Sequence, residues 1–431
     1  MRLAQLLPTL EVSKADVTML QNLADTLAAH NVEQYNTLSV TKDGLADPTR
    51  WRGVRRRDGV RIYKERVGVT AQGPATPQLL LLGTVEGKLD DIMYGVVATT
   101  DEAMKIKSAC THDSVQESKV LFDIVCPTLE DPFHHTSAKW RLYESKRDYV
   151  SLDTTGIIYT SKQERIGYNI SHSVAFSELP SFEATHGIER GNMSVCSLYR
   201  QKTPTTVECY VRGFFELRTQ NEMLSNLALQ TIVNGWASFS RKNECALIKK
   251  LAWRMRKSRG WSSSSSRTYS FADDLSDFKA PPTKPRRSCP KVLTATRCSV
   301  CRRSSRFMGS TRHTCKCCDR PVCSKCSVKQ SVCALAPDQC TVLERKRTFC
   351  MQCISEAQRT SSLDIAREEL LAEHHEEHKP SWDMTGGSWW DSSSSSHTYC
   401  LTGAGQRASS ISSVSSIDFR NLSSRRGNFS F

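Results

Sequence analysis

The densest chemistry of this chain lies in the cysteines between residues 298 and 353. Eleven cysteines fall within these 56 residues, and eight of them form four pairs in which two residues separate the partners. That spacing lets both thiolates of a pair bind one metal ion at about 2.3 Å. The pattern therefore predicts two tetrahedral zinc ions. The eight predicted ligands are Cys298, Cys301, Cys315, Cys318, Cys323, Cys326, Cys350 and Cys353.

Three cysteines of this region, Cys317, Cys333 and Cys340, are left outside the pairs. Either they are thiols that bind no metal, or the zinc ligands within the run 315–318 are not the two that we assign. Disulfides are the alternative to zinc, and they require a secretory context. The first ten residues carry one Arg and a short apolar run broken by Pro8, which makes a poor signal peptide. We therefore expect thiols and metal ligands in a reducing compartment and a cytoplasmic protein.

The cysteine region is strongly basic. The whole chain has a net charge of +14, and residues 286–353 carry fifteen Lys and Arg against three acids. Such a module favours anionic partners, either nucleic acid or the anionic cytoplasmic leaflet of a membrane. Nucleic acid is disfavoured because no stacking aromatics are interleaved with the basic residues. The charge therefore favours a membrane surface.

The first 250 residues contain the elements expected of an α+β domain. Ser13 and Asp16 form a capping box, and apolar residues follow it at helical spacing. Alternating apolar and polar residues then predict a series of antiparallel strands. We expect these strands over residues 79–85, 149–152, 157–159, 166–174, 193–199 and 207–216.

A long helix closes this series of strands. Leu229, Ile232, Val233, Trp236 and Ala237 lie at helical spacing, and a basic run ends at residue 257. We expect this helix to lay its apolar face on the sheet. Residues 258–290 are rich in Ser, Pro and charge and are predicted to form a disordered linker, as is the Ser-rich tail over residues 380–431. A short helix is expected within residues 358–379.

The cysteine spacing resembles the FYVE zinc-finger family over residues 291–353, which we delimit as a finger at 291–357. In that family a basic phrase binds the headgroup of phosphatidylinositol 3-phosphate. The resemblance assigns this role to Arg312, His313 and Lys316. The chain departs from the family at Thr314, where a second His is expected, and at Asp319, where a Gly is expected. The tryptophan phrase that precedes the first cysteine in the family is also missing.

The same resemblance implies a membrane-inserting loop at Phe307 and Met308. The alternative is that Phe307 is the packed aromatic residue of a small core. RING-type ubiquitin ligases share the interleaved arrangement of two zinc ions, but they place a ligand two residues before the third pair. Four residues separate Cys318 from Cys323, which favours the FYVE-like interpretation.

Residues 10–255 are similar to the START-like lipid-binding domains that accompany FYVE fingers in oomycete proteins. The similarity rests on the phrase over residues 51–66, the phrase over residues 82–87 and the long helix. It implies a helix-grip fold over residues 1–257, in which an antiparallel sheet wraps a long C-terminal helix around a tunnel for one hydrophobic lipid. Periodicity equally allows a filled core.

Together these features predict a non-enzymatic zinc- and lipid-binding protein, peripheral on endosomal membranes. The expected partners are a phosphoinositide-containing membrane surface and a hydrophobic ligand, while the oligomeric state stays open. The alternative is a zinc-scaffolded protein-interaction module or a RING-like ubiquitin ligase. Catalysis is disfavoured because the histidines and acids follow no catalytic motif. The residues considered were His134, His135, Asp123 and Asp131.

Overall fold

The computed structural model describes residues 2–66, 78–216, 222–237, 241–258, 297–303, 313–336 and 341–377. The predicted linker lies outside these residues almost entirely, and the predicted Ser-rich tail lies outside them altogether. None of the described helices has the length and apolar content needed to cross a membrane.

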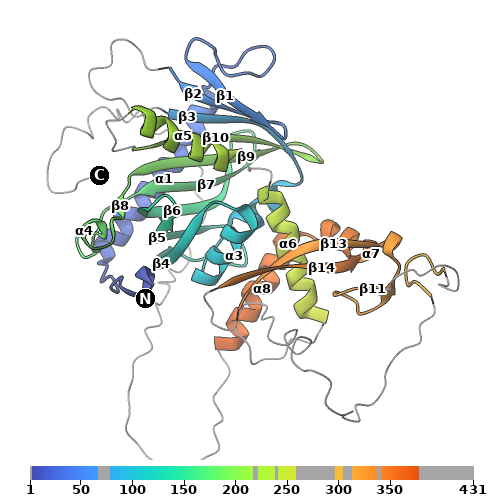
Figure 1. The fold of residues 1–431 in the computed structure, drawn as a ribbon. Helices are drawn as coiled ribbons and strands as arrows, with labels where there is room; N and C mark the ends of the chain where they lie inside the picture. Colours follow the sequence, from blue (N-terminus) through green and yellow to red (C-terminus); the bar gives the residue numbers. More distant parts are fainter. Residues whose placement is uncertain are drawn as a thin grey trace, which may run out of the picture.

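A large antiparallel sheet forms the N-terminal part of the molecule (Figure 1). Within the described residues it has ten strands in the order β1-β2-β3-β10-β9-β7-β6-β5-β4, and the short β8 pairs in parallel with β6. The strands are β1 (Trp51–Arg57), β2 (Val60–Glu65), β3 (Gln78–Glu86), β4 (Val115–Val125), β5 (His135–Tyr143), β6 (Arg147–Tyr159), β7 (Arg165–Ser173), β8 (Glu189–Arg190), β9 (Met193–Thr203) and β10 (Thr206–Phe215).

Helices cover both faces of this sheet (Figure 1). The capping box holds, since the Ser13 hydroxyl accepts a hydrogen bond from the Asp16 backbone N–H at 3.2 Å at the start of α1. The helices of this part are η1 (Leu3–Gln5), α1 (Lys14–Asn36), α2 (Leu89–Val96), α3 (Asp101–Thr111), α4 (Glu183–His186), α5 (Glu222–Trp236) and α6 (Arg241–Ser258). The predicted closing helix therefore comprises α5 and α6.

The alternation of side chains in β3 explains how both faces become core. Leu79 and Leu81 point to the face covered by α2 and α5, whereas Leu80 points to the face covered by α1. On the neighbouring β10, Val207, Cys209 and Val211 share the α5 face, as their spacing predicts. The predicted α+β arrangement is confirmed, and it is the antiparallel sheet with packed helices that the START-like resemblance implies.

The observed strands differ from the expected strands in two places, and buried charged residues of β5 and β6 contribute to both differences. The separate strands expected at 149–152 and 157–159 are a single strand, β6, and the sequence pattern missed β4 and β5. Buried polar residues such as Lys139, Arg141 and Asp153 lie on the inner face here and break the apolar alternation. These residues satisfy one another inside the protein, so hydropathy alone does not reveal the strands.

The cysteine-rich module follows α6 and packs beside it (Figure 1). Two short β-hairpins and two helices form its described part. These elements are β11 (His313–Thr314), β12 (Pro321–Val322), η3 (Ser324–Cys326), β13 (Ser327–Leu335), β14 (Val342–Cys350), α7 (Met351–Arg359) and α8 (Ser362–Glu377). Helix α8 returns to the large domain, where Ile365 and Ala366 join the core under α2.

Candidate functional site

The eight paired cysteines come together in two groups of four. One group comprises Cys298, Cys301, Cys323 and Cys326, and the other comprises Cys315, Cys318, Cys350 and Cys353. Within each group all sulfur atoms lie within 4.8 Å of one another. The first pair along the chain thus shares a group with the third, and the second with the fourth.

The sulfur separations suit a tetrahedral metal ion. Four sulfurs at about 2.3 Å from a zinc ion lie about 3.8 Å apart, because this is the edge of the tetrahedron. The Cys301 and Cys323 sulfurs are 3.9 Å apart, and those of Cys318 and Cys350 are 4.0 Å apart. The two groups could therefore hold two metal ions, and an all-thiolate donor set is the one that structural zinc commonly uses.

Local secondary structure positions the thiols of the second group. Cys315 follows β11, while Cys350 ends β14 and caps α7, whose first turn contains Cys353. The Cys350 backbone N–H donates to the Cys315 sulfur at 3.2 Å, and the Cys353 N–H donates to the Cys350 sulfur at 3.3 Å. Such N–H donors stabilise the thiolate form that binds metal.

The pKa values of the thiols differ within the two groups. Burial opposes ionisation of Cys298, but backbone N–H groups of the Cys301 and Cys323 region lower its pKa to about 6. Burial and the neighbouring sulfurs raise the pKa of Cys318 to about 11 and that of Cys326 to about 12. A dication in each group would remove the repulsion that prevents all four thiols from ionising.

The remaining cysteines of the region lie apart from these groups. Cys317 is buried against α6 and belongs to neither group, and burial raises its pKa to about 12. The structure therefore selects Cys315 and Cys318 within the run 315–318. Cys333 packs with Cys110 and Cys245 in a separate buried cluster, and Cys340 lies outside the described residues. Cys126, in the large domain, is disulfide-bonded and departs from the expectation of free thiols.

The residues assigned to headgroup binding are described only in part. Arg312, Phe307 and Met308 lie outside the described residues. His313 is half-buried and begins β11, where it pairs with Val322, and the Lys316 backbone N–H donates to Thr348 O at 3.0 Å. Basic side chains are exposed around the two cysteine groups. They include Arg302, Arg303, Arg320, Lys325, Lys329 and Lys346.

Helix α6 links the cysteine groups to the large domain, a feature that the sequence did not indicate. Leu251 and Met255 are fully buried among the cysteines, whereas Ala246 and Trp253 on the same helix belong to the core of the sheet. Lys250, within the basic run that ends at residue 257, is buried and bonds Asp91 of α2 at 2.7 Å. The two parts of the chain thus share one helix.

Ion pairs reinforce this junction on α6. Arg254 pairs with Glu356 of α7, and Arg256 pairs with Glu369 of α8 at 2.6 Å. Lys250 also donates to Thr360 O at 2.8 Å, between α7 and α8. Because Lys250 is buried, loss of the Asp91 carboxylate would leave its charge without a counter-ion.

A buried charged cluster lies on the inner face of β5 and β6. Arg141 pairs with Asp153, and Lys139 approaches the same carboxylate at 3.9 Å and donates to Ala98 O at 2.8 Å. Burial alone would raise the pKa of Asp153, but the charges of Arg141 and Lys139 hold it well below its usual range. Burial lowers the pKa of Lys139 to about 8. Ser137, opposite Asp153, has a buried hydroxyl with no hydrogen-bond partner.

The half-buried Lys242 of α6 lies at the edge of the interior. Its Nζ donates to the Tyr199 hydroxyl at 3.0 Å, and burial lowers its pKa to about 7. The large domain is therefore polar as well as apolar inside. Nearby on β5, His135 bonds Asp123 at 2.9 Å and is buried. We find in this His–Asp pair a structural contact between β4 and β5.

Comparisons with known proteins give only distant similarities. No family model matches the sequence, and no curated protein matches it. Among solved structures, human StAR-related lipid transfer protein 5 has a TM-score of 0.35 at 13% identity, over 53% of this chain and 97% of that one. Human STARD10 has a TM-score of 0.35 at 10% identity, over 55% and 81%.

A third solved structure is the lipid transfer and protein localization domain of human StarD13 (DLC2). Its TM-score is 0.33 at 13% identity, and the match covers 45% of this chain and 88% of that domain. Similarity at this level carries no argument about fold or function. Both rest on the strand order, the packing and the cysteine geometry described above.

Proposed function

We propose that this chain is a non-enzymatic lipid-recognition protein with two binding parts. A FYVE-like finger holding two zinc ions docks on anionic membranes that contain phosphatidylinositol 3-phosphate. The large domain, START-like in its fold, binds a hydrophobic ligand. Such a protein would be peripheral on endosomal membranes.

The observation that carries this proposal is the pairing of two four-thiolate groups with an exposed basic surface. Zinc in these groups would fix the backbone around His313 and Lys316, so that their donors face a phosphate at little entropic cost. Exposed residues such as Arg303 and Lys329 would add attraction to an anionic leaflet, worth about 1 kcal/mol for each basic residue near the surface. The basic finger therefore suits a membrane better than it suits a small neutral ligand.

The shared helix α6 supports a joint role of the two parts. Because α6 packs on both the sheet and the finger, a docked finger would hold the large domain at a fixed orientation to the bilayer. A hydrophobic ligand could then pass between the membrane and the large domain without release into water.

Liposome sedimentation tests the membrane part. We compare the full chain on vesicles with phosphatidylinositol 3-phosphate and on vesicles of equal charge made with phosphatidylserine. The variant Arg312→Ala with His313→Ala should lose most of its preference for the phosphoinositide, since it loses donors to the phosphate. The charge-matched control Arg303→Ala should keep the preference.

Equal binding to the two vesicle types by the unmodified chain would contradict phosphoinositide recognition and leave general charge attraction as the explanation. Activity in an in vitro ubiquitin-chain assay would instead favour the RING-like alternative. Neither result depends on the ligand of the large domain.

A further inference from the structure

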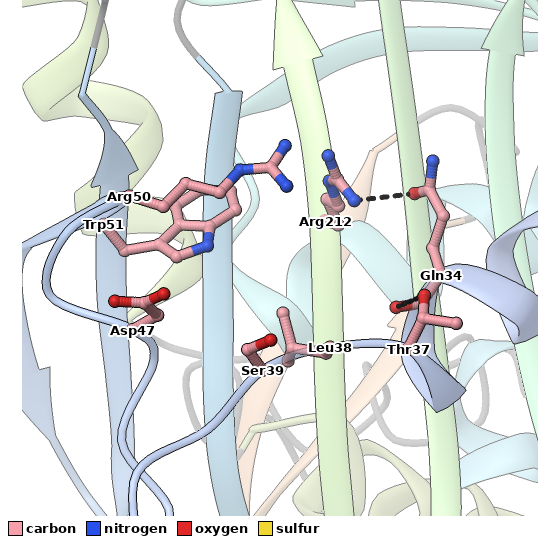
Figure 2. Close-up of a pocket in the computed structure, with 8 residues that line it drawn as sticks. All are labelled: Gln34, Thr37, Leu38, Ser39, Asp47, Arg50, Trp51 and Arg212. Atoms are coloured by element: carbon pink, nitrogen blue, oxygen red, sulfur yellow. Dashed lines mark hydrogen bonds between the residues drawn. The ribbon is translucent and has the colours of Figure 1, made fainter.

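A second candidate site lies on the opposite face of the sheet from α5. A cavity of about 450 Å³ lies where the end of α1 and the start of β1 meet β10 (Figure 2). Its walls include Gln34 of α1, Arg50 and Trp51 at the start of β1, and Arg212 of β10. Cavities of this size hold small ligands or headgroups. Neither the cysteine groups nor the charged cluster of the interior contributes to it.

Two guanidinium groups flank one indole ring in this cavity. The guanidinium carbon of Arg50 lies 5.5 Å from the centre of the Trp51 ring, and that of Arg212 lies 5.8 Å from it. Figure 2 shows both guanidinium groups beside the same space. Trp51 is buried and Arg212 is half-buried, whereas Arg50 is exposed, so a buried ring and a half-buried guanidinium form the inner wall and Arg50 lies at the rim. Stacked guanidinium groups present their N–H donors edgewise to a ligand.

The positive charge of Arg212 has no acidic partner in the described part of the chain. Its Nε donates to Gln78 Oε1 at 2.8 Å and its Nη1 donates to Gln34 Oε1 at 2.9 Å, and both acceptors are neutral. These amides use two of the five N–H donors of the guanidinium and orient it. Arg50, in contrast, pairs with Glu65 at 2.7 Å. Of the two guanidinium groups in the wall, that of Arg212 is therefore the one without an acidic partner.

The acidic residue of the cavity wall, Asp47, accepts hydrogen bonds within its own turn. Asp47 accepts hydrogen bonds from the Thr49 backbone N–H at 2.9 Å and the Thr49 hydroxyl at 2.7 Å, which lower its pKa. Figure 2 shows the Asp47 carboxylate beside Trp51, with Arg212 across the cavity. Asp47 thus shapes the turn before β1 and stays a carboxylate, so the ligand is expected on the Arg212 side of the cavity.

Two tyrosines lie on the same face of the sheet as Arg212, behind the cavity wall. Tyr63 and Arg212 are both register partners of Leu80, on the two strands that flank β3, and Tyr210 precedes Arg212 by two residues. The Tyr210 hydroxyl interacts with the Arg212 guanidinium, and neither tyrosine lines the cavity.

We propose that this cavity binds a phosphate monoester, with Arg212 and Arg50 as the groups that hold the phosphate. A phosphate offers several acceptor oxygens and up to two negative charges, which suit the guanidinium donors and the charge of Arg212 that has no acidic partner. The exposed Ser39 at the rim adds a hydroxyl group. The ligand is either a soluble phosphate ester or the headgroup of a phospholipid such as phosphatidic acid.

Isothermal titration calorimetry on the full chain with glycerol 3-phosphate tests the soluble form. Sedimentation with phosphatidylcholine vesicles, with and without phosphatidic acid, tests the lipid form. Arg212→Gln should weaken binding about tenfold or more, because a charge-assisted hydrogen bond is lost. Arg56→Gln, an exposed position of β1 away from the cavity, is the matched control and should stay within about twofold of the unmodified chain.

Ser39→Asp tests the proposal in a second way, since it places a carboxylate at the exposed rim and leaves both arginines in place. It should weaken binding as strongly as Arg212→Gln while unfolding at the same temperature as the unmodified chain. Loss of binding in both cavity variants supports the proposal, and the probe that responds identifies the source of the phosphate. If neither probe binds, or if Arg212→Gln and Ser39→Asp bind as Arg56→Gln does, the proposal fails.

Discussion

Cys315, Cys317 and Cys318 lie within four residues of one another, yet they have different environments. Cys315 and Cys318 face the sulfurs of the Cys350 pair, whereas Cys317 points into the core formed with α6. The chain direction after β11 decides this, because neighbouring side chains along the turn cannot all reach one point. The ligand set is thus fixed by side-chain direction within a run that looks uniform.

Metal content of serine variants tests this assignment. Cys318→Ser should reduce the zinc content of the purified chain from two ions to one, because the second group loses a thiolate ligand. Cys317→Ser, the matched control one residue away, should keep both ions. Elemental analysis by mass spectrometry measures the content. Loss of zinc in Cys317→Ser with retention in Cys318→Ser would reverse the assignment.

Lys242 predicts a specific pH dependence of stability. Burial lowers its pKa to about 7 in the folded chain, against about 10.4 when unfolded. Between these values the unfolded chain binds more protons, so the free energy of unfolding rises with pH by up to about 1.4 kcal/mol per pH unit. The stabilisation is complete above the unfolded pKa and is lost as pH falls to about 7.

The variant Lys242→Met should flatten this dependence. Urea unfolding at several pH values between about 7 and 9 should give a smaller rise in the free energy of unfolding than in the unmodified chain. Lys202→Met, at an exposed position of β9, should keep the original slope. Loss of the Tyr199 hydrogen bond shifts the whole curve, so the slope is the readout. An unchanged slope in Lys242→Met would show that Lys242 is not buried as a neutral amine.

At the scale of elements, α6 serves two cores at once. One side of the helix covers α2 and the sheet domain, and the other side packs on β13 and the cysteines (Figure 1). A surface helix normally shows one apolar stripe and one polar face. In α6, Lys250 is buried and forms an ion pair with Asp91, although it lies within the basic run at the end of the helix.

Truncation of Met255 tests the second core of α6. Met255 is fully buried, so Met255→Ala should lower the free energy of unfolding by about 3 kcal/mol through lost contacts and a cavity. Leu227→Ala on α5, a residue 65% exposed, should change it by less than about 0.5 kcal/mol. Denaturant unfolding monitored by circular dichroism measures both. A value for Met255→Ala near that of the control would show that the finger does not pack on α6.

At the scale of the whole molecule, the sheet domain and the finger form a continuous structure. Helix α8 leaves the finger and packs under α2, and its Glu369 bonds Tyr94 at 3.0 Å. The finger is therefore attached both through α6 and through α8. Unfolding of the finger should consequently destabilise the large domain.

Removal of zinc tests this coupling. A chelator should lower the melting temperature of the large domain by about 5 °C or more, because loss of the finger's packing removes several kcal/mol of contacts to α6. Fluorescence of tryptophan, with Trp140 buried in the sheet domain as one reporter, follows the transition. Addition of zinc should restore the original value. If the chelator does not change the melting temperature of the large domain, the two parts are energetically independent.

Local patterns predicted much of this molecule, because their physical causes are local. A two-residue gap brings two thiolates to one metal, and the Ser13 hydroxyl caps α1 through the backbone N–H three residues further on. Apolar residues along β3 and β10 mark buried strands. For these features the sequence alone was sufficient. The strand β5 was missed because Lys139 and Arg141 pair inside the protein with a distant acid, Asp153 of β6.

Tertiary structure decided what depends on residues far apart in the chain. The spacing of the cysteines does not by itself say which pairs share a metal ion, since Cys298 and Cys326 meet only after the intervening chain has folded. The packing of α6 on two cores and the meeting of Arg50 with Arg212 around Trp51 likewise require the complete fold. Contacts of this kind depend on long-range packing, which leaves little periodic signal in the sequence.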